Sequence, residues 1–148
     1  MNTNVEVKIS HMAWDQETGK DKKVKETYVI DAFNYTEAES IITKIILEDK
    51  LKDVTINGIK PIKIREIFLD KDGDSTTDDG KFWYTCKIAF VVAVKEDGTK
   101  KTKKENVLIK GIDIKDALEN LKLSMTETVD DWDSVAISST SIYQVVLK

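Results

Sequence analysis

The sequence has little of the chemistry that cysteine and histidine supply: it contains one cysteine, Cys86, and one histidine, His11. A single cysteine cannot close an intramolecular disulfide, which fits a reducing cytosol. One cysteine and one histidine are also too few ligands for a Cys/His zinc site. Cys86 falls on the apolar face of a predicted strand, so we interpret it as a small core residue. His11 follows the first predicted strand, where we expect an inert surface histidine rather than a general base.

Glycine is also scarce, and its spacing excludes several enzyme classes. The six glycines form neither a GxGxxG nor a GxxxxGK[ST] phosphate loop, and no serine lies in a GxSxG elbow. No nucleophile–base pair or metal constellation can be assembled from the sequence, so we expect a protein that is not an enzyme and has no cofactor.

Long apolar runs are absent as well. No run approaches the roughly 18 residues that span a bilayer. The first residues have neither the basic start nor the apolar middle that is typical of a signal peptide. We therefore expect a cytoplasmic protein with no membrane partner.

Positive charge does not dominate the chain. There are 23 lysines and arginines against 27 aspartates and glutamates, which gives a net charge of -4 and a pI of about 5.1. This balance excludes a uniformly basic nucleic-acid-binding protein but not a local basic patch. With 41% hydrophobic and 34% charged residues, the 148 residues predict a globular chain with a real core.

The chain is similar to itself. When it is shifted by 79 positions, residues 5–42 overlay residues 84–121 without a gap, and nine of these 38 pairs are identical. Chance gives about two or three identities at usual amino-acid frequencies. Similar secondary structure alone is the alternative explanation, but the identities include glycine, acids and lysines of the turn region. The identical pairs include Lys8/Lys87, Gly19/Gly98, Lys22/Lys101, Lys25/Lys104 and Glu26/Glu105.

A shift of 78 positions continues the overlay from residues 53–70 to residues 131–148. We interpret the pattern as a tandem duplication within a single domain. Its parts are repeat 1 at residues 4–69, an acidic linker at residues 70–81 and repeat 2 at residues 82–148.

Each repeat begins with a predicted β-hairpin followed by a helix. The turns contain Gly19 and Gly98, which can take the positive φ that a hairpin loop needs. Asn34 and Asp113 are the aligned candidates for helix N-caps, and Thr36 is an alternative cap in the first repeat. Apolar residues recur at helical spacing in both copies: Ala38, Ile41, Ile42 and Ile45, then Ala117, Leu118, Leu121 and Met125.

A third strand is predicted at Lys60–Leu69 and again at Ser138–Leu147, with Pro61 near the start of the first. A strand–helix–strand connection is right-handed and leaves its two strands parallel, so the order in each repeat is 2-1-3 with the helix on one face. The predicted fold class is α+β. Two β-β-α-β units form one mainly antiparallel six-stranded sheet, or a half-open barrel, with two helices.

The acidic linker has some likeness to a calcium-binding loop. Counted from Asp70, however, its sixth residue is Ser75 instead of glycine and its twelfth is Lys81 instead of glutamate. We interpret it as a solvated linker, and weak binding of a divalent ion is the alternative. We expect no metal site.

Lysines gather on the two predicted hairpins. Paired lysine-rich tips can straddle a phosphate backbone. Against this, acids are interleaved, lysine also guards exposed strand edges, and Arg65 is the only arginine, so a solvated hairpin is the alternative. Trp83 is added as a residue that can stack on a base, because it faces opposite to Tyr84. The candidate nucleic-acid-binding residues are Lys20, Lys22, Lys23, Lys25, Lys100, Lys101, Lys103, Lys104 and Trp83.

Residues 23–42, KVKETYVIDAFNYTEAESII, resemble the T-E-x-Y-L-V-D-A-x-S-F-T-E-A-E signature of domain of unknown function 4494, a family of Bacteroidota and their bacteriophages. Asn34 replaces a serine of the signature, while Ile30 and Tyr35 are conservative departures. KIREIF at residues 63–68 and ENVLIKGIDIKDALENL at residues 105–121 are also similar. The resemblance implies a phage or mobile-element setting in a bacterial cell and supplies no catalytic residues. The matching residues are Tyr28, Val29, Asp31, Ala32, Thr36, Glu37, Ala38 and Glu39.

These observations favour a non-enzymatic phage or prophage binding protein, associated with nucleic acid as an accessory to DNA replication or recombination. One alternative is a structural, assembly or adaptor protein of a bacteriophage, which binds a phage or host protein by strand addition. Another is a protein that sequesters a small molecule between its repeats. The sequence does not determine an oligomeric state.

Overall fold

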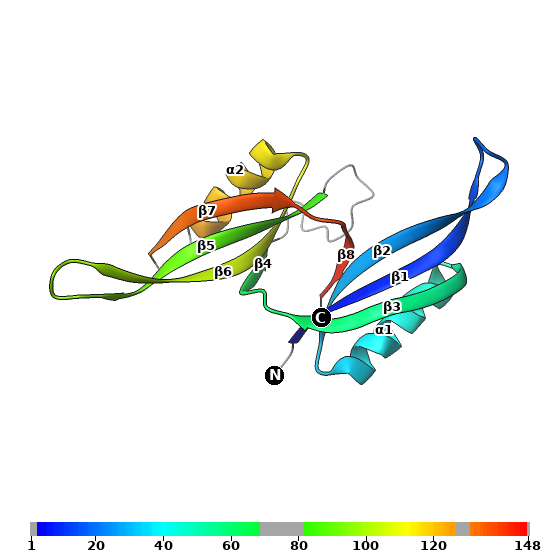
Figure 1. Cartoon of the computed structure of the whole chain (residues 1–148), viewed down its shortest axis with the longest axis horizontal. Helices are drawn as coiled ribbons and strands as arrows, with labels where there is room; N and C mark the ends of the chain where they lie inside the picture. Colours follow the sequence, from blue (N-terminus) through cyan, green and yellow to red (C-terminus); the bar gives the residue numbers. More distant parts are fainter. Residues whose placement is uncertain (1–2, 69–81, 127–130, 148) are drawn as a thin grey trace. The chain divides into compact units, whose positions relative to one another are not determined.

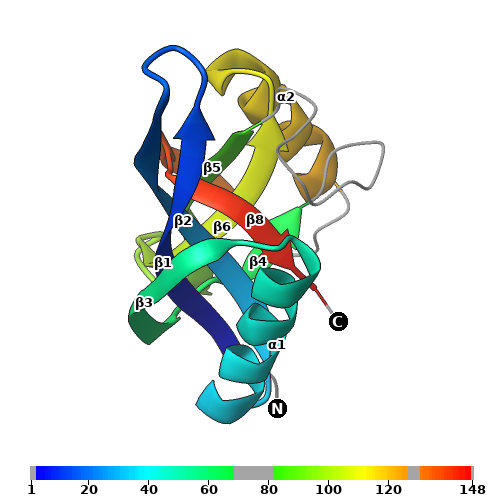
Figure 2. The same cartoon turned by 90° about the vertical axis from the view of Figure 1, so that its right-hand side faces the viewer.

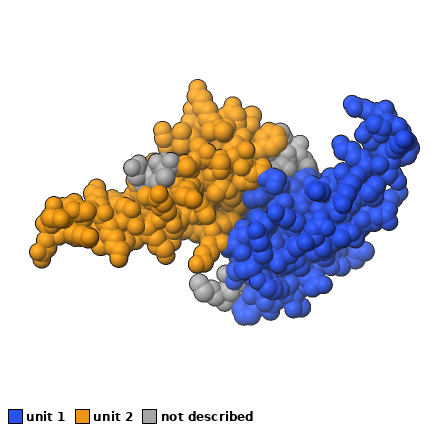
Figure 3. Space-filling model, viewed as in Figure 1, with its two compact units in different colours: residues 1–62, 141–148 blue, residues 63–140 orange. Residues whose placement is uncertain are grey.

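The computed structural model describes residues 3–68, 82–126 and 131–147 of the chain. The predicted acidic linker at residues 70–81, with its alternative role as an ion-binding loop, lies outside these residues. The fold is α+β, with two helices and two four-stranded sheets (Figure 1). The chain divides into two compact units, one containing residues 1–62 and 141–148 and the other residues 63–140 (Figure 3).

The first unit is a four-stranded sheet in the order β3-β1-β2-β8, with one helix packed on one face (Figure 2). β1 is antiparallel to both β2 and β3, and β8 is parallel to β2. Its elements are β1 (Thr3–Asp15), β2 (Lys20–Ala32), α1 (Tyr35–Glu48), β3 (Lys52–Ile62) and β8 (Ile142–Val146).

The second unit has the same plan, with the strand order β4-β6-β5-β7. β5 is antiparallel to both β6 and β7, and β4 is parallel to β6. Its elements are β4 (Glu66–Phe68), β5 (Phe82–Val94), β6 (Lys100–Gly111), α2 (Ile114–Met125) and β7 (Trp132–Ser139).

The α+β class, the two helices and the strand order 2-1-3 are confirmed, but the single six-stranded sheet or half-open barrel is wrong. The predicted third strand at residues 60–69 contains the end of β3 and then all of β4. In the same way, the predicted strand at residues 138–147 contains the end of β7 and then β8. Each predicted strand is therefore two strands that belong to different sheets, and the sheet count rises from one to two.

The fourth strand of each unit comes from the other predicted repeat. β8, at the end of repeat 2, pairs with β2 between Thr27 and Ile30. β4, at the end of repeat 1, pairs with β6 between Val107 and Ile109. Each compact unit therefore contains residues of both predicted repeats, and the unit boundaries do not follow the repeat boundaries.

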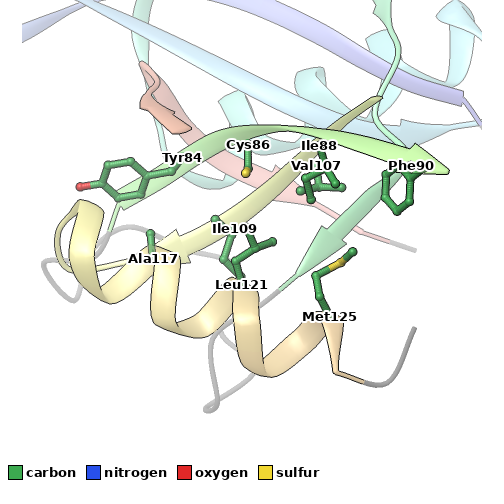
Figure 4. Packing of buried hydrophobic residues seen from close by; sticks show 9 residues of the cluster. All are labelled: Tyr84, Cys86, Ile88, Phe90, Val107, Ile109, Ala117, Leu121 and Met125. Atoms are coloured by element: carbon green, nitrogen blue, oxygen red, sulfur yellow. The ribbon is translucent and has the colours of Figure 1, made fainter. Parts of the chain in front are cut away.

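The core of each unit lies between its sheet and its helix. In the second unit Tyr84, Cys86 and Ile88 of β5 meet Ala117 and Leu121 of α2 (Figure 4). Cys86 is fully buried there, which confirms its interpretation as a small core residue. The first unit repeats this arrangement with Val5, Val7, Ile9, Tyr28 and Ile30 against Ala38 and Ile42.

The turns and caps expected from the sequence are present. Gly19 has a φ of 66° and Gly98 a φ of 85°, the left-handed region that glycine tolerates best. The side chain of Asn34 accepts a hydrogen bond from the Glu37 amide at 2.9 Å, and that of Asp113 accepts one from the Asp116 amide at 2.8 Å. Because α1 already begins at Tyr35, the alternative start at Thr36 is wrong.

Pro61 lies near the end of β3, not at a strand start as expected. β3 is an edge strand of its sheet, a position at which proline is tolerated. Within the described residues, neither helix is long and apolar enough to cross a membrane.

Candidate functional site

All eight lysines singled out in the sequence lie on the two long hairpins and are exposed. In the first unit, residues 20–25 of β2 pair with residues 10–15 of β1. In the second, residues 100–104 of β6 pair with residues 89–94 of β5. Both hairpins extend beyond the helix of their own unit as two-stranded arms (Figure 1). The lysines therefore lie along strands, and not only at the tips.

Strand alternation divides these lysines between two faces of each sheet. Tyr28 and Ile30 point toward α1, so Lys20 and Lys22 share the helix side and Lys23 and Lys25 lie on the opposite side. We call the side opposite the helix the open face. By the same alternation from Val107 and Ile109, Lys101 and Lys103 share the helix side, and Lys100 and Lys104 lie on the open face.

Two further lysines join the open faces. Lys8 in β1 is paired with Thr27, which places it diagonally beside Lys25. Lys87 in β5 is paired with Asn106, which places it diagonally beside Lys104. We define the lysine faces as Lys8, Lys23 and Lys25 in the first unit and Lys87, Lys100 and Lys104 in the second.

The sequence contains a signal for Lys8 and Lys87. Lys8/Lys87 and Lys25/Lys104 are both identical pairs of the self-alignment, yet only the second pair lies in the lysine-rich stretches that drew attention to the hairpins.

The lysine face of the first unit is hollowed into a cavity of about 530 Å³. Its wall includes the three lysines together with Thr27, Asn57 and Ser141, residues that carry ammonium, amide and hydroxyl groups. Such groups suit the oxygen atoms of an anion. Within the described residues, no carboxylate lies at ion-pair distance from Lys23 or Lys25, so both ammonium groups are available to a ligand.

Glutamates limit the positive potential near this cavity. Glu6 is 3.7 Å from the Lys8 ammonium and 3.5 Å from that of Lys60. Glu26 also lines the cavity, but its two oxygens are held by His11 and by Tyr28. Lys23 and Lys25 therefore contribute more to attracting an anion than Lys8 does.

The only arginine of the chain is used inside the second unit. The Arg65 guanidinium donates to Glu105 Oε2 at 2.5 Å and lies 3.8 Å from the centre of the Phe90 ring. Its backbone amide donates to the Asn106 carbonyl at 2.8 Å, so the residue joins the start of β4 to β6. The Arg65 guanidinium beside Glu105 holds the pKa of that carboxyl below its usual range. A ligand on the open face meets lysine, not arginine.

Trp83 does not lie where a stacking residue is needed. It is fully buried in β5, paired with Lys110, and its carbonyl accepts a hydrogen bond from the Thr140 hydroxyl at 2.9 Å. A tryptophan that is mostly exposed is Trp14, near the outer end of β1, at 64% exposure.

His11 is buried, contrary to the expectation of a surface residue. β1 runs on to Asp15, so His11 is part of the strand and is only 7% exposed. Its Nε2 lies 2.5 Å from Glu26 Oε1, and the Tyr28 hydroxyl donates to Glu26 Oε2 at 2.5 Å. Burial, reinforced by the Glu26 carboxylate, raises the pKa of the Tyr28 hydroxyl far above its ordinary value. The three groups satisfy one another, so we interpret the cluster as structural.

The described residues contain no group of three or more histidine, cysteine, aspartate or glutamate side chains that could hold a metal ion. Fold and site together define an α+β protein with two four-stranded sheets, each covered by one helix and each carrying lysines on its open face.

The chain belongs to the family described as the domain of unknown function DUF4494, whose family model matches residues 4–148. This match confirms the resemblance seen in the sequence. Comparison with curated proteins and with solved structures finds no match for the chain.

Proposed function

We propose that the protein is a non-enzymatic binding protein of a phage or prophage that holds nucleic acid on its two lysine faces. The observation that carries the proposal is the recurrence of one lysine pair. Lys8 and Lys25 lie diagonally across β1 and β2, and Lys87 and Lys104 lie in the same way across β5 and β6. A charge pair that occurs in both units suits a ligand with a repeated charge, such as a phosphate backbone.

Lysine chemistry defines what kind of binding this is. An ammonium group attracts phosphate as a point charge, whereas base edges are read mostly by the fork of arginine. Because Arg65 is bound to Glu105, we expect binding that depends on salt and depends little on sequence. A role as an accessory to DNA replication or recombination is compatible with such binding.

The proposal is tested by fluorescence anisotropy with labelled single- and double-stranded DNA. The variant K25Q/K104Q removes one open-face lysine from each unit. We expect it to bind at least tenfold more weakly than the wild type at low salt. The matched control, K44Q/K115Q, removes the same charge from exposed positions on the two helices and should bind within about twofold of the wild type. Equal losses in both variants, or no binding by the wild type at low salt, contradict the proposal.

A second candidate function is that of an adaptor or assembly protein, and the outer part of β5 favours it. Val92 and Val94 are 54% and 64% exposed, and in the described residues β7 does not extend alongside them. A partner strand could pair with this free edge. Mass spectrometry of purified phage particles tests this function, because a virion component is present in stoichiometric amounts and an intracellular protein is not.

A further inference from the structure

A second concave site lies on the first unit, beside the arm formed by β1 and β2. β3 begins at Lys52, opposite Met12, while β1 continues to Asp15. In the described residues no strand pairs with this last part of β1 on the β3 side. The space left there is a cavity of about 480 Å³, which we call the notch, lined by Met12, Ala13, Trp14, Lys50, Leu51 and Lys52 among others.

The backbone that forms one wall of the notch is unusual. Lys50 has a φ of 53° and Asp53 a φ of 52°, so two residues other than glycine adopt the left-handed region within four positions. The amide of Leu51 donates to the Ile46 carbonyl at 3.1 Å, which fixes this turn to the end of α1. Non-glycine residues in this conformation are often found where a side chain has a functional position.

The notch combines an aromatic surface with charged residues of both signs. Trp14 exposes 64% of its surface, and Met12 and Leu51 add apolar wall. Lys50 and Lys52 are exposed and line the same space, as do the acids Asp21 and Asp53. The Trp14 ring suits a nucleobase, because every base has a face that stacks on an aromatic side chain, and the two lysines suit an attached phosphate.

The notch adjoins the lysine face of the first unit. Met12 is the cross-strand partner of Lys23, and Trp14 is two residues further along β1, on the same side of the strand as Lys8. A nucleic-acid strand that follows Lys25 and Lys23 therefore reaches Trp14 next.

The second unit lacks the aromatic part of this site. In the self-alignment, Val91 stands at the position of Met12 and Ala93 at the position of Trp14. The lysine pair Lys8/Lys25 thus recurs as Lys87/Lys104, whereas no aromatic residue stands at the Trp14 position in the second unit.

We propose that the notch takes one unpaired nucleobase, stacked on Trp14, with the neighbouring phosphate held by Lys50 and Lys52. The ligand is therefore single-stranded nucleic acid, since the bases of a duplex are already stacked and paired. This inference rests on the proposed function, because the lysine face brings the strand to the notch.

The test compares three ligands: an oligothymidylate, a duplex of the same length, and thymidine monophosphate. Intrinsic tryptophan fluorescence reports stacking, and anisotropy of labelled DNA reports affinity. The oligothymidylate should quench the wild type, and most of that quenching should be lost in W14F. W14A should bind the oligothymidylate at least fivefold more weakly and the duplex within twofold of the wild type. W14F, which keeps an aromatic ring, should restore most of the single-strand affinity.

Two further variants complete the test: one removes the lysines of the notch, and the other is a control. K50Q/K52Q should weaken oligothymidylate binding as W14A does. Y35A removes an exposed aromatic ring from α1 and should change nothing. If W14A leaves single-strand affinity unchanged, or lowers single-strand and duplex affinity alike, the notch is not a base site. The K25Q/K104Q variant tests the lysine faces independently of this result. If the monophosphate quenches Trp14 as strongly as the oligomer at equal concentration, the ligand is a free nucleotide and the single-strand inference is overturned.

Discussion

Two glutamates at matching positions of the repeats have different partners, and they show how the units diverge at the residue scale. Glu26 is held by His11 and Tyr28, while Glu105 is held by Arg65 and lies 3.5 Å from the Lys103 ammonium. The first set is buried and the second lies nearer to solvent. Glu26 joins β2 to His11 of β1, and Glu105 joins β6 to Arg65, the residue before β4.

The Arg65–Glu105 pair predicts a pH dependence of stability. Because Arg65 lowers the pKa of the folded Glu105 carboxyl, the pair stabilises the fold fully above the unfolded pKa of about 4.3, and this contribution is lost as the pH falls through the lowered folded pKa. We expect E105Q to be less stable than the wild type at pH 7, by about 1 kcal/mol or less, and to have a smaller deficit near pH 3. Urea unfolding at both pH values measures this. E96Q, in the exposed turn, is the control, and a difference independent of pH would contradict the prediction.

Gly111 is required by the close approach of α2 to the end of β6. A Cβ at this position would lie 2.6 Å from the Ala117 amide nitrogen and 2.8 Å from its Cα. Backbone cannot yield as a side chain does, so we expect G111A to cost about 1–3 kcal/mol in the free energy of unfolding. A Cβ at Gly58 meets nothing within 4 Å, so G58A should stay within about 0.5 kcal/mol of the wild type. Equal effects in the two variants would show that the helix does not approach β6 this closely.

At the element scale, the helices were the most predictable parts of the chain. Their caps and apolar spacing are local signals, carried by Asn34, Asp113 and the residues that follow them. The arms were harder, because residues 20–25 and 100–104 carry lysines on both faces and show no apolar alternation. Their strand structure depends on pairing with β1 and β5.

The caps provide a direct test of where α1 begins. N34A and D113A each remove the acceptor of a first-turn amide, so each should cost about 1 kcal/mol in the free energy of unfolding. T36A removes the side chain of the rejected alternative cap and should change stability by less than about 0.5 kcal/mol. Urea denaturation followed by circular dichroism compares the three variants. A larger cost for T36A than for N34A would place the start of the helix later.

At the scale of the whole molecule, the sequence does not reveal that β4 and β8 each join the sheet of the other repeat. The segments at residues 60–69 and 138–147 each read as one strand, because nothing local marks the change of sheet between Ile62 and Glu66 or between Ser139 and Ile142. The partners β6 and β2 are distant in sequence. For the same reason four of the six lysines of the lysine faces can be predicted from the sequence, whereas Lys8 and Lys87 become their neighbours only through strand register.

The pairing of β8 with β2 predicts that this C-terminal strand stabilises the first unit. Val145 of β8 is fully buried and pairs with Val29, while Tyr143 packs edge-on against Tyr28 with ring centres 5.6 Å apart. V145A should therefore cost about 2 kcal/mol, and L147A, at a more exposed position, less than about 1 kcal/mol. Hydrogen exchange should show lower protection of β2 amides in V145A. Unchanged protection there would contradict the pairing of β8 with β2.

The central claim is that equivalent lysines on the two open faces contact a phosphate backbone. Its most direct test is the slope of log Kobs against log salt concentration for single-stranded DNA, measured for K25Q, K104Q and K25Q/K104Q beside K44Q/K115Q. Each open-face lysine should reduce the slope by roughly 0.7, so that the double variant loses about 1.4 and the helix control loses nothing. Slopes that are the same in all four variants would contradict the claim.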